Sequence, residues 1–319
     1  MDSLTQAALG AAIGESMLGR KIGGKAALIG AALATIPDLD VVLYLFYDKL
    51  DMLSIHRGFS HSLVFSLLGG ILLAFMLSRL KWLACIGFKS LFLFSWLCLF
   101  THLLLDTFTA YGTQLLLPFS DARLGLDSIN VVDPLYTLPL LLGLLLSIWL
   151  FPKHPNRSKF NHYGLLVSTL YLLFTLFHKE LVKADFSRRF AQQEIQYDAL
   201  LSMPVGIGNI NWYGVAKGQD SIWMLQYSLL NKSDSKATSF PINEELLNEV
   251  DQHLAHKMRW FAKGFYTVDK VDGRIRIYNL QVDMRGITWD GDKKAPTVGY
   301  FEVDNQEGES TFSSGSIGK

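Results

Sequence analysis

The stretch "SLFLFSWLCLFTHLLLD", residues 90–106, decides how this chain folds. It holds no Asp, Glu, Lys or Arg before Asp106 and belongs to an apolar run over 90–108. A helix needs about 20 apolar residues to cross a hydrocarbon core, so this run predicts a membrane span. Five further apolar runs lie at 3–18, 26–46, 59–78, 135–151 and 162–178.

Most of these runs are long enough to cross a membrane, and a more polar region follows them. The first run is short and carries Glu15, so it also fits a helix that lies in the interface or re-enters. From about Ala184 onward, charges and turn residues return. We expect a mainly α chain: a polytopic transmembrane helical bundle of five or six helices over 1–180, a small soluble α+β extramembrane domain over 184–310, and a disordered tail over 311–319.

The expected soluble domain carries signals for both strands and helices. "SIWMLQYSLL" (221–230) is rich in aromatic and aliphatic residues and predicts a strand. The segment 243–265 has apolar residues at helical spacing. The chain then predicts a hairpin that turns at Asp272 and Gly273.

Composition excludes several classes of protein. The 319 residues are 50% hydrophobic and 18% charged with zero net charge, which fits membrane spans plus a soluble part and points away from nucleic acid. Two cysteines, Cys85 and Cys98, are too few for a disulfide framework. Asp2 and the lack of a basic first segment predict no cleavable signal peptide.

Basic residues flank the apolar runs unevenly, and cytoplasmic loops carry the excess of lysine and arginine. One set of loops holds Arg20, Lys21, Lys25, Arg79, Lys81, Lys89, Lys153, Arg157 and Lys159. The opposite set holds only Lys49, Arg57 and Arg123. This distribution places 47–58, 109–134 and the C-terminal domain outside the cytoplasm. The residues that argue for the reverse placement of that domain are Lys179, Lys183, Arg188 and Arg189.

Four polar clusters interrupt the apolar runs: "PDLD" (37–40), "HRGFSH" (56–61), "HLLLD" (102–106) and "DSINVVDP" (127–134). In the topology above, the last three fall at the outer ends of their helices, where they can meet. His102 and Asp106 are four residues apart and therefore share one helix face. Pro37 is expected to break its helix.

Imidazole and carboxylate groups together suit Zn, Mn or Fe(II), and six candidate ligands allow one or two ions. Each Asp deep in a bilayer costs about 2.5–3.5 kcal/mol, so three unpaired aspartates cost on the order of 8–10 kcal/mol. Binding one transition metal returns roughly 10 kcal/mol. A metal is therefore the simpler account of the clusters.

Each cluster also has an ordinary structural interpretation. An "HxxxD" pair on a helix can be only a hydrogen-bonded pair. "HRGFSH" can anchor the interface, with Arg57 on headgroup phosphates and Ser60 capping the next helix. "PDLD" can simply end a helix.

Taken together, the motifs resemble the YdjM-type family of bacterial inner-membrane proteins, which are described as metal-dependent hydrolases. The resemblance covers about residues 1–151. It rests on "MDSLTQAALGAAIGE" (1–15), "IPDLD" (36–40), "HRGFSHS" (56–62), "HLLLDTFTAYGTQLLLPFSD" (102–121) and "LDSINVVDPLYTLPLLL" (126–142).

The resemblance implies a multi-pass protein of the bacterial inner membrane with a divalent metal site. The implied ligands are Asp38, Asp40, His56, His61, His102 and Asp106. Family members often carry a histidine where this chain has Gln6, so this departure puts a second metal in doubt.

The leading hypothesis is a metal-dependent hydrolase that acts on an ester or phosphoester, such as that of a lipid, at the outer face of the membrane. Arg57 can hold a phosphate. Asp127 or Asp133 can orient a ligand histidine or accept a proton. The rivals are a transporter or metal-ion carrier that uses the same cluster, and a membrane anchor that presents the soluble domain.

Overall fold

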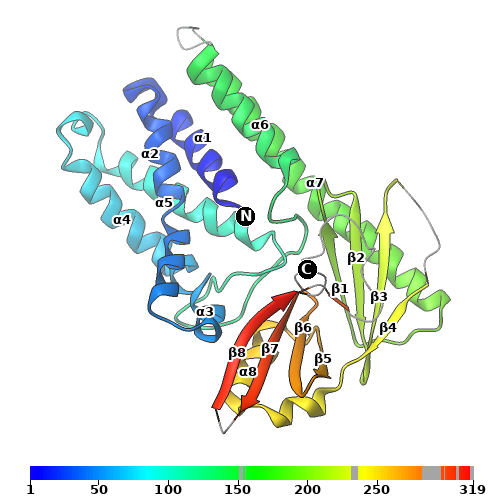
Figure 1. Cartoon of the computed structure of the whole chain (residues 1–319). Coiled ribbons are helices and arrows are strands. Elements are labelled where there is room, and N and C mark those ends of the chain that lie inside the picture. The colour runs from blue at the N-terminus through cyan, green and yellow to red at the C-terminus, as the bar shows by residue number, and fades with distance from the viewer. Residues whose placement is uncertain are drawn as a thin grey trace. The chain divides into compact units, whose positions relative to one another are not determined.

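The computed structural model describes residues 1–150, 154, 156–230, 236–281, 296–297, 299–306 and 309–316. Its contacts divide the chain into two compact units (Figure 1). The first unit joins Met1–Leu43 to Ile55–Leu176. The second joins Tyr44–Ser54 to Phe177–Lys319, so a short segment of the N-terminal half belongs with the C-terminal domain.

The first unit is helical. Its helices are α1 (Ser3–Ile22), α2 (Lys25–Ala34), α4 (Leu63–Ser78), α5 (Phe88–Thr107), α6 (Pro134–Leu144) and the first part of α7 (Arg157–Gln192). Shorter pieces are the 3-10 helices η1 (Pro37–Leu45), η2 (Phe59–His61) and η3 (Lys81–Leu83), and the π-helix η4 (Leu145–Leu150).

Among the described residues, α5 and α7 are each long and apolar enough to cross a membrane. The count rises to four if two bent pairs each form one span: α2 with η1, bent by 52°, and Lys49–His61 with α4, bent by 54°. Length and composition therefore support two to four spans, against an expected five or six helices. Pro37 breaks its run as predicted, because α2 ends at Ala34 and η1 begins at the proline.

Helices α1 and α2 pack closely because small residues line their contact. A Cβ added to Gly10 would lie 2.2 Å from the backbone oxygen of Gly30, and one added to Gly14 would lie 2.1 Å from that of Ala26. Glycine at such positions lets two helix backbones approach without side chains between them. This contact fixes the end of α2, whose last residue Ala34 takes part in the site described below.

The second unit contains two antiparallel four-stranded sheets, which confirms the predicted strand and hairpin. The segment 243–265, expected to be helical, forms a 3-10 helix over Glu244–Glu249 and an α-helix over Gln252–Phe261. The first sheet runs β1 (Ala199–Val205), β2 (Asn211–Lys217), β3 (Ser221–Ser228), β4 (Thr238–Pro241). The second runs β5 (Tyr266–Val271), β6 (Arg274–Asn279), β7 (Gly299–Gln306), β8 (Glu309–Ser316). The unit also holds α3 (Lys49–Ile55, through Ser54), η5 (Glu244–Glu249) and α8 (Gln252–Phe261).

The core of the first sheet lies against the C-terminal part of α7 (Figure 1). Phe186 and Phe190 of that helix are fully buried with Trp212 and Leu225 of the strands. Gly214 leaves room for the Phe186 ring, since a Cβ there would lie 2.5 Å from it.

The segment Tyr44–Ser54 is held in the second unit by two kinds of contact. Met52 is fully buried, and Asp51 pairs with Lys257 of α8 at 2.5 Å. At the other end of the chain, residues 311–316, expected to be disordered, form most of β8, where Phe312 stacks on Phe301 with ring centroids 5.3 Å apart. Residues 317–319 lie outside the described part of the chain.

Candidate metal centre

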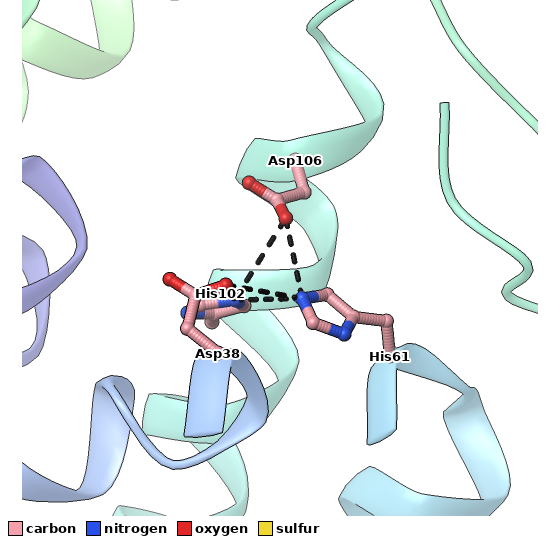
Figure 2. Close-up of side chains that lie close together, drawn as sticks. All are labelled: Asp38, His61, His102 and Asp106. Carbon is pink, nitrogen blue, oxygen red and sulfur yellow. Dashed lines mark hydrogen bonds and ion pairs between the residues drawn. The ribbon is translucent and has the colours of Figure 1, made fainter. Parts of the chain in front are cut away.

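Four side chains from three elements converge in the first unit (Figure 2). Asp38 comes from η1, His61 from η2, and His102 and Asp106 from one face of α5, as their spacing predicted. One donor atom from each lies within 4.8 Å of the others. The last three residues are fully buried, whereas the side chain of Asp38 is 18% exposed.

The separations between these donor atoms are close to those of a tetrahedral metal site. The two Nε2 atoms of His61 and His102 lie 3.2 Å apart. Asp38 Oδ1 is 3.4 Å from each of them, and Asp106 Oδ2 is 3.4 Å from His61 and 3.8 Å from His102. Ligands bound tetrahedrally at about 2.0–2.2 Å from zinc lie about 3.3–3.6 Å apart.

Hydrogen bonds on the far side of each ring determine which nitrogen carries a proton. His102 Nδ1 lies 2.6 Å from the Ala34 carbonyl oxygen, which can only accept, so Nδ1 donates. Ser60 donates its hydroxyl proton to Asp40 Oδ2 at 2.8 Å, so its oxygen accepts from His61 Nδ1 at 2.9 Å. Both rings therefore turn their Nε2 atoms toward each other, and in its neutral form each ring offers a lone pair there.

The two carboxylate oxygens of Asp106 have different neighbours. Oδ1 accepts from Gln6 Nε2 at 2.9 Å and from the amino group of Met1. Oδ2 faces the two histidines and forms an ion pair with Arg57 Nε at 3.2 Å. Among the described residues, no hydrogen-bond donor satisfies this buried oxygen. Two lone pairs and two carboxylate oxygens thus meet at one point, an arrangement that calls for a cation.

Asp40 and His56, two of the six expected ligands, lie beside this group and outside it. Asp40 Oδ1 pairs with His56 Nδ1 at 2.8 Å, and Oδ2 accepts from the Arg57 backbone nitrogen at 3.1 Å and from Ser60. Asp40 therefore holds the "HRGFSH" loop in shape, including the left-handed backbone of Arg57 at φ 58°. The His56 side chain is 22% exposed.

Arg57 lies inside the protein, and the interfacial-anchor interpretation of its cluster is wrong. It is 6% exposed, donates through Nη1 to Thr109 Oγ1 at 2.9 Å, and lies over the Tyr111 ring. The cap of α4 is Ser62, which accepts from Phe65 N, and Ser60 faces Asp40 instead.

Arg123 lies over the same Tyr111 ring as Arg57, at 4.7 Å from its centroid. Burial, together with the nearby charge of Arg57, lowers the pKa of Arg123 to about 10. The guanidinium therefore stays charged at neutral pH.

Asp127 and Asp133 do not belong to the four-donor group among the described residues. Asp133 caps α6 by accepting from Leu135 N at 2.9 Å, and its other oxygen accepts from the Tyr171 hydroxyl at 2.7 Å. Asp127 lies half-buried in the preceding loop with φ 46°.

Sequence reasoning missed the groups that orient the two rings. The Ala34 carbonyl has no sequence signal, because any residue supplies one. Ser60 has a signal only in retrospect: it precedes His61 directly and has the hydroxyl that the ring needs. Gln6, noted for its departure from the family pattern, contacts Asp106.

Comparisons with known proteins identify one family and two relatives. Residues 1–182 match the model of the YdjM inner membrane protein family. Over 174 residues the chain is 31% identical to protein YfhP of Bacillus subtilis (strain 168), covering 52% of each chain, so it spans about half the length of that relative. Over 122 residues it is 34% identical to the inner membrane protein YbcI of Escherichia coli (strain K12), covering 38% of this chain and 69% of YbcI. No solved structure matches. The chain belongs to the YdjM inner membrane protein family.

Proposed function

We propose that this chain is a metal-dependent hydrolase of the bacterial inner membrane that cleaves an ester or phosphoester, with membrane lipids as the first substrates to test. One observation carries the proposal: two histidine Nε2 lone pairs and two carboxylate oxygens converge in a buried place. A cluster of this donor type is what hydrolytic metal sites use.

Asp38, His61, His102 and Asp106 would hold one Zn, Mn or Fe ion, which when bound supplies Lewis acidity for hydrolysis. The described residues contain one group of this kind, which favours a single ion over two. The unsatisfied Oδ2 of Asp106 and the converging lone pairs fit this assignment.

The neighbouring residues orient the ligands and balance charge. Ala34 and Ser60 keep the Nδ1 protons away from the centre, and Arg57 offsets the negative charge of Asp106. His56 Nδ1 is paired with Asp40. The other ring nitrogen, Nε2, is therefore the atom of His56 that can exchange a proton with substrate.

Substrate would approach on the side of Asp38 and His56, because these are the partly exposed members of the site. The distribution of lysine and arginine supports an outer-face site and an extracytoplasmic C-terminal domain. A site at the outer face of the membrane would be close to lipid headgroups, which is why phospholipids lead the list of substrates. Asp133 is proposed only as the cap of α6.

The first experiment measures metal per chain by inductively coupled plasma mass spectrometry on detergent-purified protein. We expect close to one equivalent in the natural sequence and almost none in a His61→Ala, His102→Ala double variant, which loses both nitrogen ligands. The matched control is His162→Ala, an exposed histidine of α7, which should keep its metal. Equal metal in the double variant and the control would contradict the assignment.

The second experiment separates hydrolysis from transport. Purified protein in vesicles is given phospholipids and simple phosphate and carboxylate esters, and His102→Ala is expected to abolish turnover while still inserting in the membrane. Turnover retained in that variant would refute the hydrolase. Uptake of a divalent ion into the same vesicles without any hydrolysis would favour the transporter.

A further inference from the structure

A line of exposed apolar side chains follows one face of α7 out of the first unit and into the second. Their spacing of three or four residues keeps them on one face. They are Leu166, Leu170, Leu173, Phe177 and Leu181, each between 53% and 64% exposed. On a helix long and apolar enough to cross a membrane, such a stripe is the surface that faces lipid.

The loop between β1 and β2 projects an apolar residue at its tip. Its sequence is "GIGNI" (206–210), and three of its residues, Gly206, Gly208 and Asn209, have positive φ of 73°, 78° and 61°. This backbone turns the chain sharply around Ile207, which is 50% exposed. An exposed isoleucine at the tip of a glycine-rich hairpin loop has no role in the core of its own sheet.

Hydrogen bonds hold this loop beside the end of the apolar stripe. Asn209 Oδ1 lies 2.8 Å from His178 Nδ1, one residue beyond Phe177 on α7. Trp212 Nε1 donates to the Asn209 backbone oxygen at 3.1 Å, and its ring meets the His178 ring edge-on. The β1–β2 loop is therefore level with the last residues of the stripe.

The end of β3 adds to the same surface. Leu229 N donates to the Ile210 backbone oxygen at 3.0 Å, which ties the residues after β3 to the β1–β2 loop. Leu229 is 42% exposed and Leu230 83%. We call the five exposed residues that gather here the apolar end: Phe177, Leu181, Ile207, Leu229 and Leu230.

We propose that the apolar end contacts the lipid bilayer, so that the loops at one end of the first sheet insert into the interface of the membrane that α7 crosses. Phe177 and Leu181 belong to the exposed apolar stripe of α7, and the His178–Asn209 hydrogen bond holds the β1–β2 loop beside them, which favours lipid as the occupant. Lys183 follows on α7 and is exposed, and its long stem can reach headgroup phosphates. The proposal does not depend on the metal site or on hydrolysis.

The test compares the two ends of the same sheet in the full chain. In a Cys85→Ser, Cys98→Ala background, an environment-sensitive fluorophore is attached at Ile207→Cys, Leu230→Cys or Gln219→Cys. Gln219 lies in the β2–β3 turn at the opposite end of the sheet and is exposed, so it is the matched control. The protein is placed in phosphatidylethanolamine and phosphatidylglycerol nanodiscs, with and without lipids that carry a nitroxide near the top of the acyl chain.

We expect quenching by the nitroxide lipid at positions 207 and 230 to exceed that at 219 by about twofold or more, with the reverse order for aqueous iodide. Equal lipid quenching at all three positions would overturn the proposal. A label at 207 and 230 that is shielded from both quenchers would overturn it too, because it would identify a protein as the occupant. Leu230 is so exposed that its replacement should not disturb folding, which keeps the test decisive if Ile207→Cys misfolds.

Discussion

Ser60 and Ser62, on either side of His61, differ in their hydrogen-bond partners. Ser60 accepts from the His61 ring and donates to Asp40, whereas Ser62 caps α4. Removing an outer partner of a metal-bound histidine typically weakens metal binding about 10- to 100-fold. We therefore expect Ser60→Ala to weaken metal affinity by at least about tenfold, measured by competition with a chelating dye.

Ser62→Ala is the matched control for that prediction. Loss of a helix cap costs about 0.5–2 kcal/mol of stability, so this variant should unfold more easily and yet bind metal normally. If both variants lost metal equally, the effect would come from disturbing the loop and not from the His61 hydrogen bond.

At the residue scale, the sequence predicted what local spacing determines. His102 and Asp106 share a helix face because they are four residues apart, and the structure places them together. Asp40 and His56 are chemically equivalent to the residues of the four-donor group, and only the bend at Pro37 and the turn at Arg57 direct them elsewhere. Proline announces the first of these bends, but the turn at Arg57 is held by Asp40, 17 residues earlier, which residue type does not reveal.

At the scale of elements, the α1–α2 contact is the most sensitive to side-chain size. A Cβ at Gly10 would lie 2.2 Å from the Gly30 backbone oxygen, so the helices would have to separate. Overpacking of this kind costs about 1–3 kcal/mol. We expect Gly10→Ala to lower the thermal unfolding midpoint and to weaken metal binding, since the end of α2 carries the Ala34 carbonyl that orients His102.

Gly87→Ala serves as its control, because nothing lies within 4 Å of the added Cβ and the backbone there has φ −64°. This variant should change stability by less than about 1 kcal/mol. A Gly10→Ala protein as stable as the Gly87→Ala protein would mean that the two helices separate without cost.

The boundaries of helices and strands were predictable where proline or glycine marks them. Pro37 marks a break, and Asp272 with Gly273 marks the β5–β6 turn, where both residues have positive φ. The π-helix at Leu145–Leu150 itself contains neither proline nor glycine, although Pro139 and Gly143 lie in α6 just before it. Likewise, the polar end of the chain looks disordered by composition, and only its pairing with β7 makes it a strand.

At the scale of the whole molecule, an ion pair in the second unit makes stability depend on pH. Glu302 of β7 lies directly opposite Arg276 of β6 and accepts from it at 2.8 Å. This hydrogen bond holds the pKa of Glu302 below its ordinary value of 4.5. The unfolded chain therefore binds a proton at a higher pH than the folded chain, so the stability from this pair is present above about pH 4.5 and is lost as pH falls through the folded pKa.

Glu302→Gln should accordingly unfold at a lower temperature than the natural sequence at pH 7, and the difference should vanish in stronger acid. Thermal unfolding followed by β-sheet circular dichroism measures it. Glu245→Gln, at an exposed residue of η5, provides a control that should match the natural sequence throughout. A gap between Glu302→Gln and the natural sequence that persisted in acid would count against this origin.

The sequence predicted a separate C-terminal domain but not every segment that belongs to it. The composition change near residue 180 anticipated a separate C-terminal domain, and the contacts divide α7 at Leu176 and Phe177. Nothing in the composition of Tyr44–Ser54 indicates that it belongs with that domain. The Asp51–Lys257 pair joins the segment to α8, and a single sequence cannot show such a pairing.

The placement of Tyr44–Ser54 in the second unit also has a consequence for biosynthesis. This segment joins the element of Asp38 to the loop of His61, yet its partners are translated far later, from residue 177 onward. A ribosome adding about 5–20 residues per second needs roughly 10–50 s to travel from Ser54 to the end of β8. Once Asp106 has been translated, the nascent chain carries all four donors, while Asp51 of their connecting segment still lacks its partner Lys257. All four donors are therefore synthesised well before the segment between them reaches its final contacts.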